Sequence, residues 1–392
     1  MIALFHKALT ASAHVTVPVP PVVPTTIVTP PPPPVPVEFP LGWLLAHAAA
    51  PIQYRAIVDV ARLPRSPNDR IGHLPFASRS ALMLAAMQRA DGTWPGGMLG
   101  VPGARAEHFE GVGTVNAVRR LLEYGWDRES PPLARARRIL FRLLAEDADP
   151  AYLFEFGKAA GDEELVRHYR LVLREAAAAA LAQMGYEGDP RLRGAARRLL
   201  DRVHTYLKSP LAQKPWVRVG NRQVLPPEAA PPSIYLLTML AFMPQFRSEC
   251  HEQVDRIYQH LSQPQPRQEA AQLRGGKIVA VPHYVLGDLL PTRNTADDDV
   301  PFAIVWLELM ARLGYLRRNE GWMRLFERFL DDRDAQGVWH PHKGLASPRS
   351  GNPYVWPLFP LEESAAGDER WSDITFRLGL IARFAGRPLD VV

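Results

Sequence analysis

The stretch 175–207, EAAAAALAQMGYEGDPRLRGAARRLLDRVHTYL, carries the pattern that decides the fold. Its first part, Ala176 to Leu181, is apolar nearly all round, which is typical of a helix buried on most sides. A turn containing Tyr186 follows, and the remainder has apolar residues three and four apart with arginines between them. The stretch therefore predicts a helical hairpin with one buried helix and one amphipathic helix.

Three further stretches align with this one and predict the same hairpin. They are VNAVRRLLEYGWDRESPPLARARRILFRLL (115–144), SIYLLTMLAFMPQFRSECHEQVDRIYQHL (233–261) and IVWLELMARLGYLRRNEGWMRLFERFL (304–330). The aromatic residues of the four turns are Trp126, Tyr186, Phe246 and Tyr315, spaced by 60, 60 and 69 residues. A recurrence of this kind indicates a repeat architecture.

Stacked hairpins explain both helix types. A single hairpin cannot bury its own apolar face, so neighbouring hairpins must pack together. Almost nothing in the chain alternates like a β-strand. We therefore predict an all-α fold, an α/α toroid in which the buried helices form an inner ring and the amphipathic helices an outer ring. An open superhelix of helix pairs would give a similar pattern.

The N-terminal part has a different composition. Residues 17–40, VPVPPVVPTTIVTPPPPPVPVEFP, contain too many prolines for a continuous helix and predict an extended chain. We predict that residues 1–40 form a disordered, proline-rich segment and that residues 41–392 form a single domain. The segment is expected to act as a spacer, a tether or a docking site for a partner.

Composition narrows the classes of partner. The 392 residues carry a net charge of +5, and the arginines recur along helical stretches rather than in one run. This favours solvated helix faces, and we predict no nucleic-acid partner. The single cysteine, Cys250, excludes an intrachain disulfide and a multi-cysteine metal site. No stretch predicts a transmembrane helix or a signal peptide, so we expect a cytoplasmic protein and leave peripheral membrane contact and the oligomeric state open.

Two short motifs carry a family resemblance. Residues 84–94 read LAAMQRADGTW, with Gln88, Gly92 and Trp94, and residues 329–339 read FLDDRDAQGVW, with Asp334 in place of the glutamine. This pattern resembles the repeat motif of squalene–hopene and oxidosqualene cyclases, which share the α/α-toroid architecture with protein prenyltransferases. In that family the Gln and Trp tie adjacent helices together, and a Gln amide suits this because it can satisfy unpaired groups at a helix end.

The same resemblance points to an acidic site. Residues 294–301 read NTADDDVP, and class II terpene cyclases carry Asp-x-Asp-Asp-Thr-Ala at the start of an inner helix. The resemblance implies that Asp297 is the general acid that protonates an isoprenoid, and that Asp298 and Asp299 tune it. Thr295 stands where the family has its first Asp. The alternative reading is helix capping, because Pro301 suits a first helical turn and acidic residues favour that end.

Several other side chains are candidates for the same cavity. Trp306, Tyr235 and Phe242 are expected to bind the substrate and stabilise a cation, although core packing would equally explain aromatic residues. Glu110 is a possible cavity carboxylate or a helix cap, and His340 a possible partner of the acid or an exposed loop residue.

The function predicted on this basis is protonation-initiated cyclisation of an isoprenoid in a central apolar cavity. No cofactor and no metal site are expected, except that Mg²⁺ would accompany a diphosphate substrate. A non-catalytic toroid that binds a hydrophobic ligand or a protein partner is the alternative. A carbohydrate-active enzyme with a separated carboxylate pair, such as Glu110 and Asp298, is a third possibility.

Overall fold

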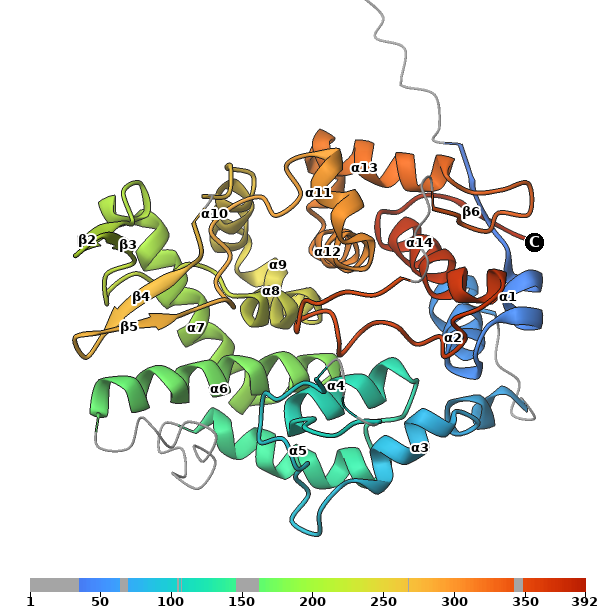
Figure 1. Ribbon diagram of the computed structural model, residues 1–392, viewed down its shortest axis with the longest axis horizontal. Coiled ribbons are helices and arrows are strands. Elements are labelled where there is room, and N and C mark those ends of the chain that lie inside the picture. The colour runs from blue at the N-terminus through green and yellow to red at the C-terminus, as the bar shows by residue number, and fades with distance from the viewer. Residues whose placement is uncertain are drawn as a thin grey trace, which may run out of the picture. The chain divides into compact units, whose positions relative to one another are not determined.

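The computed structural model describes residues 35–63, 70–103, 106, 108–145, 162–266, 268–341 and 348–392. Contacts divide the chain into two units, Met1–Pro34 and Val35–Val392, and the described residues belong to the second. Helices dominate this unit, which confirms the prediction of a predominantly helical fold (Figure 1). Residues 1–34 of the predicted proline-rich segment, and His342, which follows the second repeat motif, lie outside the described residues.

The helices follow one another along the chain with short connections. The α-helices are Leu41–His47 (α1), Ala50–Arg55 (α2), Arg79–Ala86 (α3), Thr114–Glu123 (α4), Pro131–Leu144 (α5), Glu163–Gln183 (α6), Pro190–Lys208 (α7), Ile234–Ala241 (α8), Pro244–Glu249 (α9), His251–Leu261 (α10), Arg293–Asp298 (α11), Val300–Arg312 (α12), Glu320–Asp331 (α13) and Ser372–Phe384 (α14). A π-helix, Ala56–Ala61 (η1), continues α2, and 3-10 helices lie at Arg70–Phe76, Pro210–Ala212, Leu316–Arg318 and Asp368–Trp371.

Six short strands accompany these helices, and the sequence pattern predicted none of them. The strands are Val37–Phe39 (β1), Val217–Val219 (β2), Arg222–Val224 (β3), Ala271–Arg274 (β4), Lys277–Ala280 (β5) and Leu389–Val391 (β6). β1 pairs with β6 in parallel, whereas β2–β3 and β4–β5 are antiparallel hairpins. The predicted extended segment ran to residue 40, but Val37 and Phe39 are buried in the core. Phe39 packs beside Gly379 of α14, where a Cβ atom would lie 2.3 Å from its ring.

Each of the four predicted hairpins is present. They are α4 with α5, α6 with α7, α8 with α10, and α12 with α13. Three of the turns close in the same way, because the aromatic amide donates to a carbonyl five residues earlier: Trp126 to Leu121, Tyr186 to Leu181, and Tyr315 to Met310. The preceding glycines, Gly125, Gly185 and Gly314, have positive φ, as this helix-ending motif requires. The turn at Phe246 lacks the glycine and instead begins the short helix α9 at Pro244.

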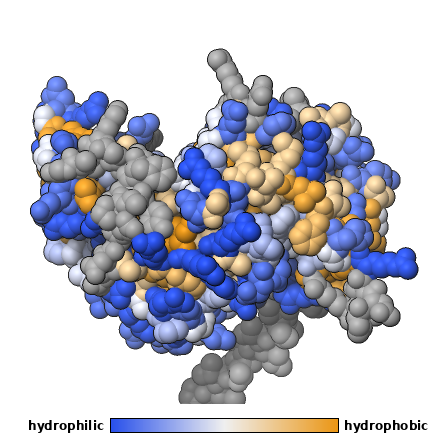
Figure 2. Space-filling view, turned by 90° about the horizontal axis from the view of Figure 1, so that it is seen from below, coloured by the Kyte–Doolittle hydropathy of each residue, from blue (hydrophilic) through white to orange (hydrophobic). Residues whose placement is uncertain are grey.

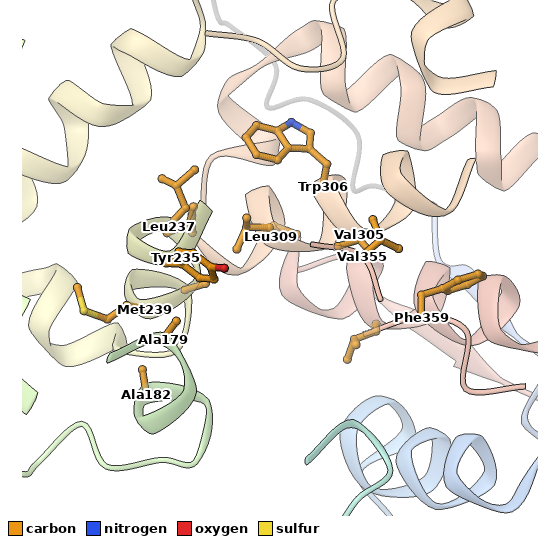
Figure 3. Packing of buried hydrophobic residues seen from close by; sticks show 14 of the residues in the cluster. Ala179, Ala182, Tyr235, Leu237, Met239, Val305, Trp306, Leu309, Val355 and Phe359 are labelled. Carbon is orange, nitrogen blue, oxygen red and sulfur yellow. The ribbon is translucent and has the colours of Figure 1, made fainter. Parts of the chain in front are cut away.

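The first helices of the hairpins are α4, α6, α8 and α12, and we count α14, which follows the last hairpin, with them. These helices are neighbours in chain order. α4 packs on α6, α6 on α8, α8 on α12, and α12 on α14, while α14 packs on η1 (Figure 1). The close approach of α6 and α8 follows from small side chains, because Ala176 to Ala180 are all buried. Figure 3 shows Ala179 and Ala182 of α6 beside the α8 residues Tyr235, Leu237 and Met239. The predicted burial of these helices is confirmed.

The second helices are amphipathic. In α5, α7, α10 and α13 most of the leucine, isoleucine, valine and aromatic side chains are buried, while most of the arginine and glutamate side chains reach solvent. Hydrophilic side chains cover much of the face seen in Figure 2, with smaller apolar patches among them. The second helices therefore expose charged side chains and bury apolar ones, as the sequence pattern predicted.

The first repeat motif ties neighbouring helices as predicted. The Gln88 amide donates to the Pro132 carbonyl in the first turn of α5, at 2.8 Å, and to the Gly92 carbonyl, at 3.0 Å. The Trp94 indole donates to the Leu84 carbonyl at 2.8 Å. In the second motif Asp334 has a different role, because its carboxylate accepts hydrogen bonds from backbone amides of its own turn.

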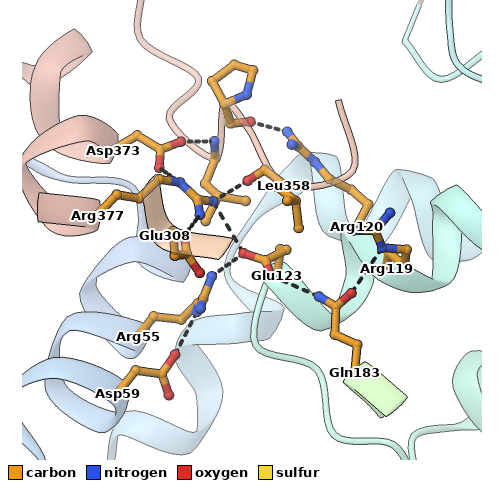
Figure 4. A network of polar contacts seen from close by, with 12 residues as sticks. Arg55, Asp59, Arg119, Arg120, Glu123, Gln183, Glu308, Leu358, Asp373 and Arg377 are labelled. Carbon is orange, nitrogen blue, oxygen red and sulfur yellow. Dashed lines mark hydrogen bonds and ion pairs between the residues drawn. The ribbon is translucent and has the colours of Figure 1, made fainter. Parts of the chain in front are cut away.

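A buried arginine on α14 joins three helices and a loop. Arg377 donates to Asp373 on its own helix at 3.0 Å, to Glu308 of α12 at 2.6 Å, and to Glu123 of α4 at 3.3 Å. It also donates to the Leu358 carbonyl (Figure 4). Burial disfavours the charged guanidinium, but these carboxylates raise the pKa of Arg377 above its ordinary value.

The same network extends to α2 and α6. Arg55 bonds Glu123 and, at 2.8 Å, Asp59 of η1. The second oxygen of Glu123 accepts from the Gln183 amide at 2.9 Å, and Gln183 accepts from Arg119 at 3.1 Å. The first helices α4, α6, α12 and α14 are therefore joined to α2 and η1 by a single set of buried polar contacts.

The network also fixes a loop between the helices. Arg120 of α4 donates to the Trp356 carbonyl at 3.0 Å and to the Pro360 carbonyl. The Leu361 amide donates to Asp373. The segment 352–361 is thereby anchored to α4 and α14 through its backbone, and the carbonyl groups of Trp356, Leu358 and Pro360 accept hydrogen bonds from arginines.

We predict that Arg377→Met destabilises the fold. The change removes one guanidinium partner from each of the buried carboxylates of Glu123, Glu308 and Asp373, and breaking a buried pair in this way costs about 3–5 kcal/mol. Urea unfolding followed by circular dichroism measures the loss. Arg324→Met is the matched control, because this side chain is 75% exposed and its pair with Glu320 should contribute less than about 1 kcal/mol. Equal losses in the two variants would contradict the role of the network.

Candidate functional site

The acidic stretch is not placed as predicted. Asp297 lies on the short helix α11 with its side chain 46% exposed, where it pairs with Arg328 and, at 3.4 Å, with Arg293. The Asp297 carboxylate thus lies at the surface between two guanidinium groups. The expected position of Asp297 in a central apolar cavity is wrong.

The two following aspartates have separate environments. Asp298 is exposed at the end of α11. Asp299 caps α12, because one of its oxygens accepts from the Phe302 amide at 3.0 Å, and the other accepts from the Ser350 hydroxyl at 2.6 Å. The capping alternative is therefore confirmed for Asp299, and the three carboxylates do not form one acidic cluster.

Two of the predicted binding aromatics are packing residues. Trp306 is buried and meets Trp322 of α13 edge-on at 6.4 Å and Phe302 in a stacked arrangement at 6.4 Å. The Trp306 indole thus faces α13, which is one of the amphipathic helices. It points away from the segment 352–361, which contacts α4 and α14. The Phe242 ring lies 4.5 Å from the Arg312 guanidinium. Both rings are accounted for by core contacts, which was the alternative weighed for them.

The remaining predicted polar residues lie at the surface. Glu110 is exposed in a turn that precedes α4, where it caps no helix. His340 pairs with Asp334 at 3.0 Å within the turn of the second repeat motif. Within the described ranges, neither residue forms an ion pair with Asp297, whose partners are Arg293 and Arg328.

Tyr235 is the predicted residue that does lie in a polar cluster. It is buried at the start of α8, with its ring 5.8 Å from Tyr354 and 6.4 Å from His283. His283 in turn lies 6.1 Å from His168 of α6. These rings lie next to a groove in the described surface.

The groove lies between α6, α7 and β4 and has a volume of about 640 Å³. Its lining is strongly basic. The residues are Glu164, Arg167, His168, Arg170, Leu171 and Arg174 of α6, Arg198, Leu199 and Arg202 of α7, and Arg274 of β4. Six arginines thus face a single carboxylate, and we define these ten residues as the arginine groove.

Several of these arginines are poorly neutralised by the protein. Within the described ranges, Arg170, Arg202 and Arg274 form no ion pair with a carboxylate. The Nε atoms of Arg170 and Arg274 are buried without a hydrogen-bond partner. Burial lowers the pKa of Arg274, and the nearby Arg202 lowers it further. Such an arrangement gains free energy when an anion enters.

A buried acid and two histidines lie beneath the groove. Burial raises the pKa of Glu175 on α6, although Arg202 and the Ser233 hydroxyl oppose this shift. That hydroxyl donates to Glu175 and also caps α8. Burial, with Arg274 and Arg202, lowers the pKa of His168 to about 4, and burial with His168 and Arg202 lowers the pKa of His283 to about 3. Near neutral pH both histidines are therefore uncharged, and the net positive charge of the groove comes from the arginines.

The sequence does contain a sign of the groove, in two rows of arginines at helical spacing. Arg167, Arg170 and Arg174 recur three and four residues apart and so share one face of α6, and Arg198 and Arg202 do the same on α7. Each row alone resembles a solvated helix face. Only the packing of α6 against α7 and β4 brings the two rows together.

Comparisons with protein-family models, with curated proteins and with solved structures found no match. Among the described residues, no group of three or more His, Cys, Asp or Glu side chains is arranged to hold a metal ion. In the same ranges no helix has both the length and the apolar character needed to cross a bilayer. Among the described residues, the arginine groove is the candidate site that the geometry supports best.

We predict that the buried histidines make the fold sensitive to acid. Between pH 6.5 and about 4 the unfolded chain binds a proton at His168 that the folded chain does not, so the free energy of unfolding falls as the pH falls. The slope is at most about 1.4 kcal/mol per pH unit for each such proton. His168→Gln should make this slope shallower in urea unfolding measured across that range.

Two features sharpen this test. Glu175 acts in the opposite direction, because its raised pKa lets the folded chain bind the extra proton, so the difference between wild type and His168→Gln is the quantity to compare. His47→Gln is the control, since this histidine is exposed on α1. An unchanged slope in His168→Gln would show that His168 is not held neutral in the folded protein.

Proposed function

We propose that the protein is an α/α toroid that binds a small molecule carrying a phosphate-type anion in the arginine groove. The toroid is supported by the order of the first helices, since α4, α6, α8, α12 and α14 are successive neighbours and α14 also contacts η1. The bond between Arg55 of α2 and Glu123 of α4 supports closure of that ring. The observation that carries the binding role is the excess of arginines over carboxylates in the groove.

Phosphate and diphosphate are the anions that this lining suits best. Guanidinium groups bind such oxyanions through two parallel hydrogen bonds, and arginine is preferred wherever this planar geometry is used. The lining contains two leucines, Leu171 and Leu199, so an apolar portion of the ligand has limited contact there. A compact, multiply charged group accordingly accounts for most of the recognition.

Binding is favoured over acid-initiated cyclisation. Asp297, the residue proposed to start such a reaction, is exposed and paired with arginines. The space between the first helices near Arg377 holds ion pairs and the anchored segment 352–361. Of the cyclisation and the binding function that the sequence suggested, ligand binding without an Asp297-dependent reaction therefore fits the geometry better. An isoprenoid ligand stays a prediction.

We predict that inorganic pyrophosphate binds to the groove and that Arg202→Ala weakens this binding. Loss of a hydrogen bond to a charged group costs about 1.5–3 kcal/mol, which is roughly tenfold to a hundredfold in Kd. Isothermal titration calorimetry at constant ionic strength measures the change. Arg324→Ala removes the same charge from an exposed position of α13 and should leave Kd unchanged. Equal affinity in the wild type and Arg202→Ala would rule out the groove as the binding site.

A second titration tests the isoprenoid expectation. Farnesyl diphosphate carries the same anionic group and an apolar chain, so tighter binding than that of pyrophosphate would support an isoprenoid ligand. Equal affinities would limit recognition to the anion. Both titrations are repeated with Mg²⁺, because a diphosphate in solution binds this ion and the described residues offer it no carboxylate cluster.

A further inference from the structure

Two projecting hairpins, β2–β3 and β4–β5, lie side by side beyond α7 (Figure 1). They are joined through Leu225, whose amide donates to Ala271 at 2.8 Å and whose carbonyl accepts from Leu273 at 2.9 Å. A small apolar cluster, separate from the main core, supports them from below. Its members are Tyr206, Leu225, Ala229, Ala230, Val281, Tyr284 and Leu286. The hairpins are therefore held as one unit with a defined outer surface.

The two hairpins and the segments that lead into them are basic in sequence. Residues 206–224 and 270–281 contain six basic residues and no aspartate or glutamate. The basic residues are Lys208, Lys214, Arg218, Arg222, Arg274 and Lys277. All three lysines within the described ranges belong to this set, although the chain is otherwise rich in arginine. Lys277 pairs with Asp162 at 3.2 Å, whereas Lys214 and Arg222 are exposed and form no ion pair with a described carboxylate.

Apolar side chains are exposed among these charges. Val217 on β2 and Ile278 on β5 are each 37% exposed, which places them among the few large hydrophobic side chains on the described surface. Val217 shares its face of the β2–β3 hairpin with Arg222, and Ile278 lies on the face of β5 opposite to Lys277. Exposed aliphatic side chains on a basic segment are typical of proteins that lie in the interface of a bilayer.

We propose that these two hairpins dock the protein on a bilayer surface that contains anionic phospholipids. The basic residues complement the negative surface potential of such a bilayer, and Val217 and Ile278 enter the region between headgroups and acyl chains. A nucleic acid would complement the charge equally well, but it offers aliphatic side chains no apolar layer. The exposed Val217 and Ile278 therefore favour the lipid surface.

The docking surface adjoins the arginine groove. Arg274 of β4 belongs to the hairpin unit and also lines the groove. Docking by the hairpins thus brings the groove to the level of the lipid phosphates. Apart from Arg274, this inference rests on residues other than those that carry the proposed anion binding, so each can be tested without the other.

Flotation with vesicles tests the charge. The full chain is mixed with vesicles of phosphatidylcholine alone or with added phosphatidylglycerol, and the bound fraction is measured over a lipid titration. We expect binding only when phosphatidylglycerol is present. The triple variant Lys214→Gln/Arg218→Gln/Arg222→Gln should bind about a hundredfold more weakly, because each basic residue near the surface contributes about fivefold. The matched control, Arg128→Gln/Arg318→Gln/Arg324→Gln, removes the same charge from exposed positions elsewhere and should bind like the wild type.

A second variant tests the apolar contact. Val217→Ser/Ile278→Ser keeps every charge and should weaken binding about tenfold, because two partly buried aliphatic side chains are lost from the interface. Equal binding of the triple variant and its control would overturn the proposal, as would equal binding to both kinds of vesicle. Competition by an oligonucleotide, with no effect of the serine variant, would identify a nucleic-acid surface and overturn it too. Pyrophosphate titration of the triple variant should match the wild type, which separates this outcome from a failure of the groove.

Discussion

The buried guanidinium of Arg377 is the constraint on which the rest of the fold depends. A charge removed from water is unfavourable unless partners surround it, and here the partners come from α4, α12 and α14 and from the Leu358 carbonyl. Burial would raise the pKa of Glu308, yet Arg312, Arg377 and Arg55 together lower it to about 2. Because the charges satisfy one another only in one arrangement, they fix how the first helices meet. Apolar packing alone, as between α6 and α8, would allow the two helices to shift more easily along each other.

This network also explains why the candidate site lies away from the middle of the helices. The segment 352–361 and the ion pairs fill the region near Arg120 and Arg377. The arginine groove lies instead between a first helix, α6, and a second helix, α7, with β4 at its side. Its charges are outside the network, so a ligand can bind there without disturbing the contacts that hold the helices together.

Much of the helical framework can be read from the sequence. The alanine run before Gln183, the aromatic turns and the two Gly-x-Trp motifs predict hairpins that the structure contains. The glycine directly before Trp126, Tyr186 and Tyr315 is a further readable signal, since it permits the turn that ends each first helix. Strands of three or four residues, such as β2, leave too little alternation to predict.

The predicted site failed for a physical reason that the sequence does not express. Asp297, Asp298 and Asp299 are adjacent in the chain, but α11 ends before Asp299 and α12 begins after it, and Asp299 has non-helical backbone angles between the two helices. The three side chains therefore meet different partners. The arginines of the groove present the opposite case, because they are distant in the sequence and converge only when the helices pack. Tyr235 was the predicted residue that reached this region, through its place at the start of α8.

The pairing of β1 with β6 has a mechanical consequence. Val37 donates to Pro388, Val392 donates to Phe39, and Gly42 donates to Val392, so the two ends of the described unit are fastened to each other. The strands are parallel, and the chain enters β1 at one end of the pair and leaves β6 at the other. Tension between the two ends therefore loads all of these hydrogen bonds together in shear instead of opening them one by one. The helical repeats are protected from tension by a clamp of three residues on each side.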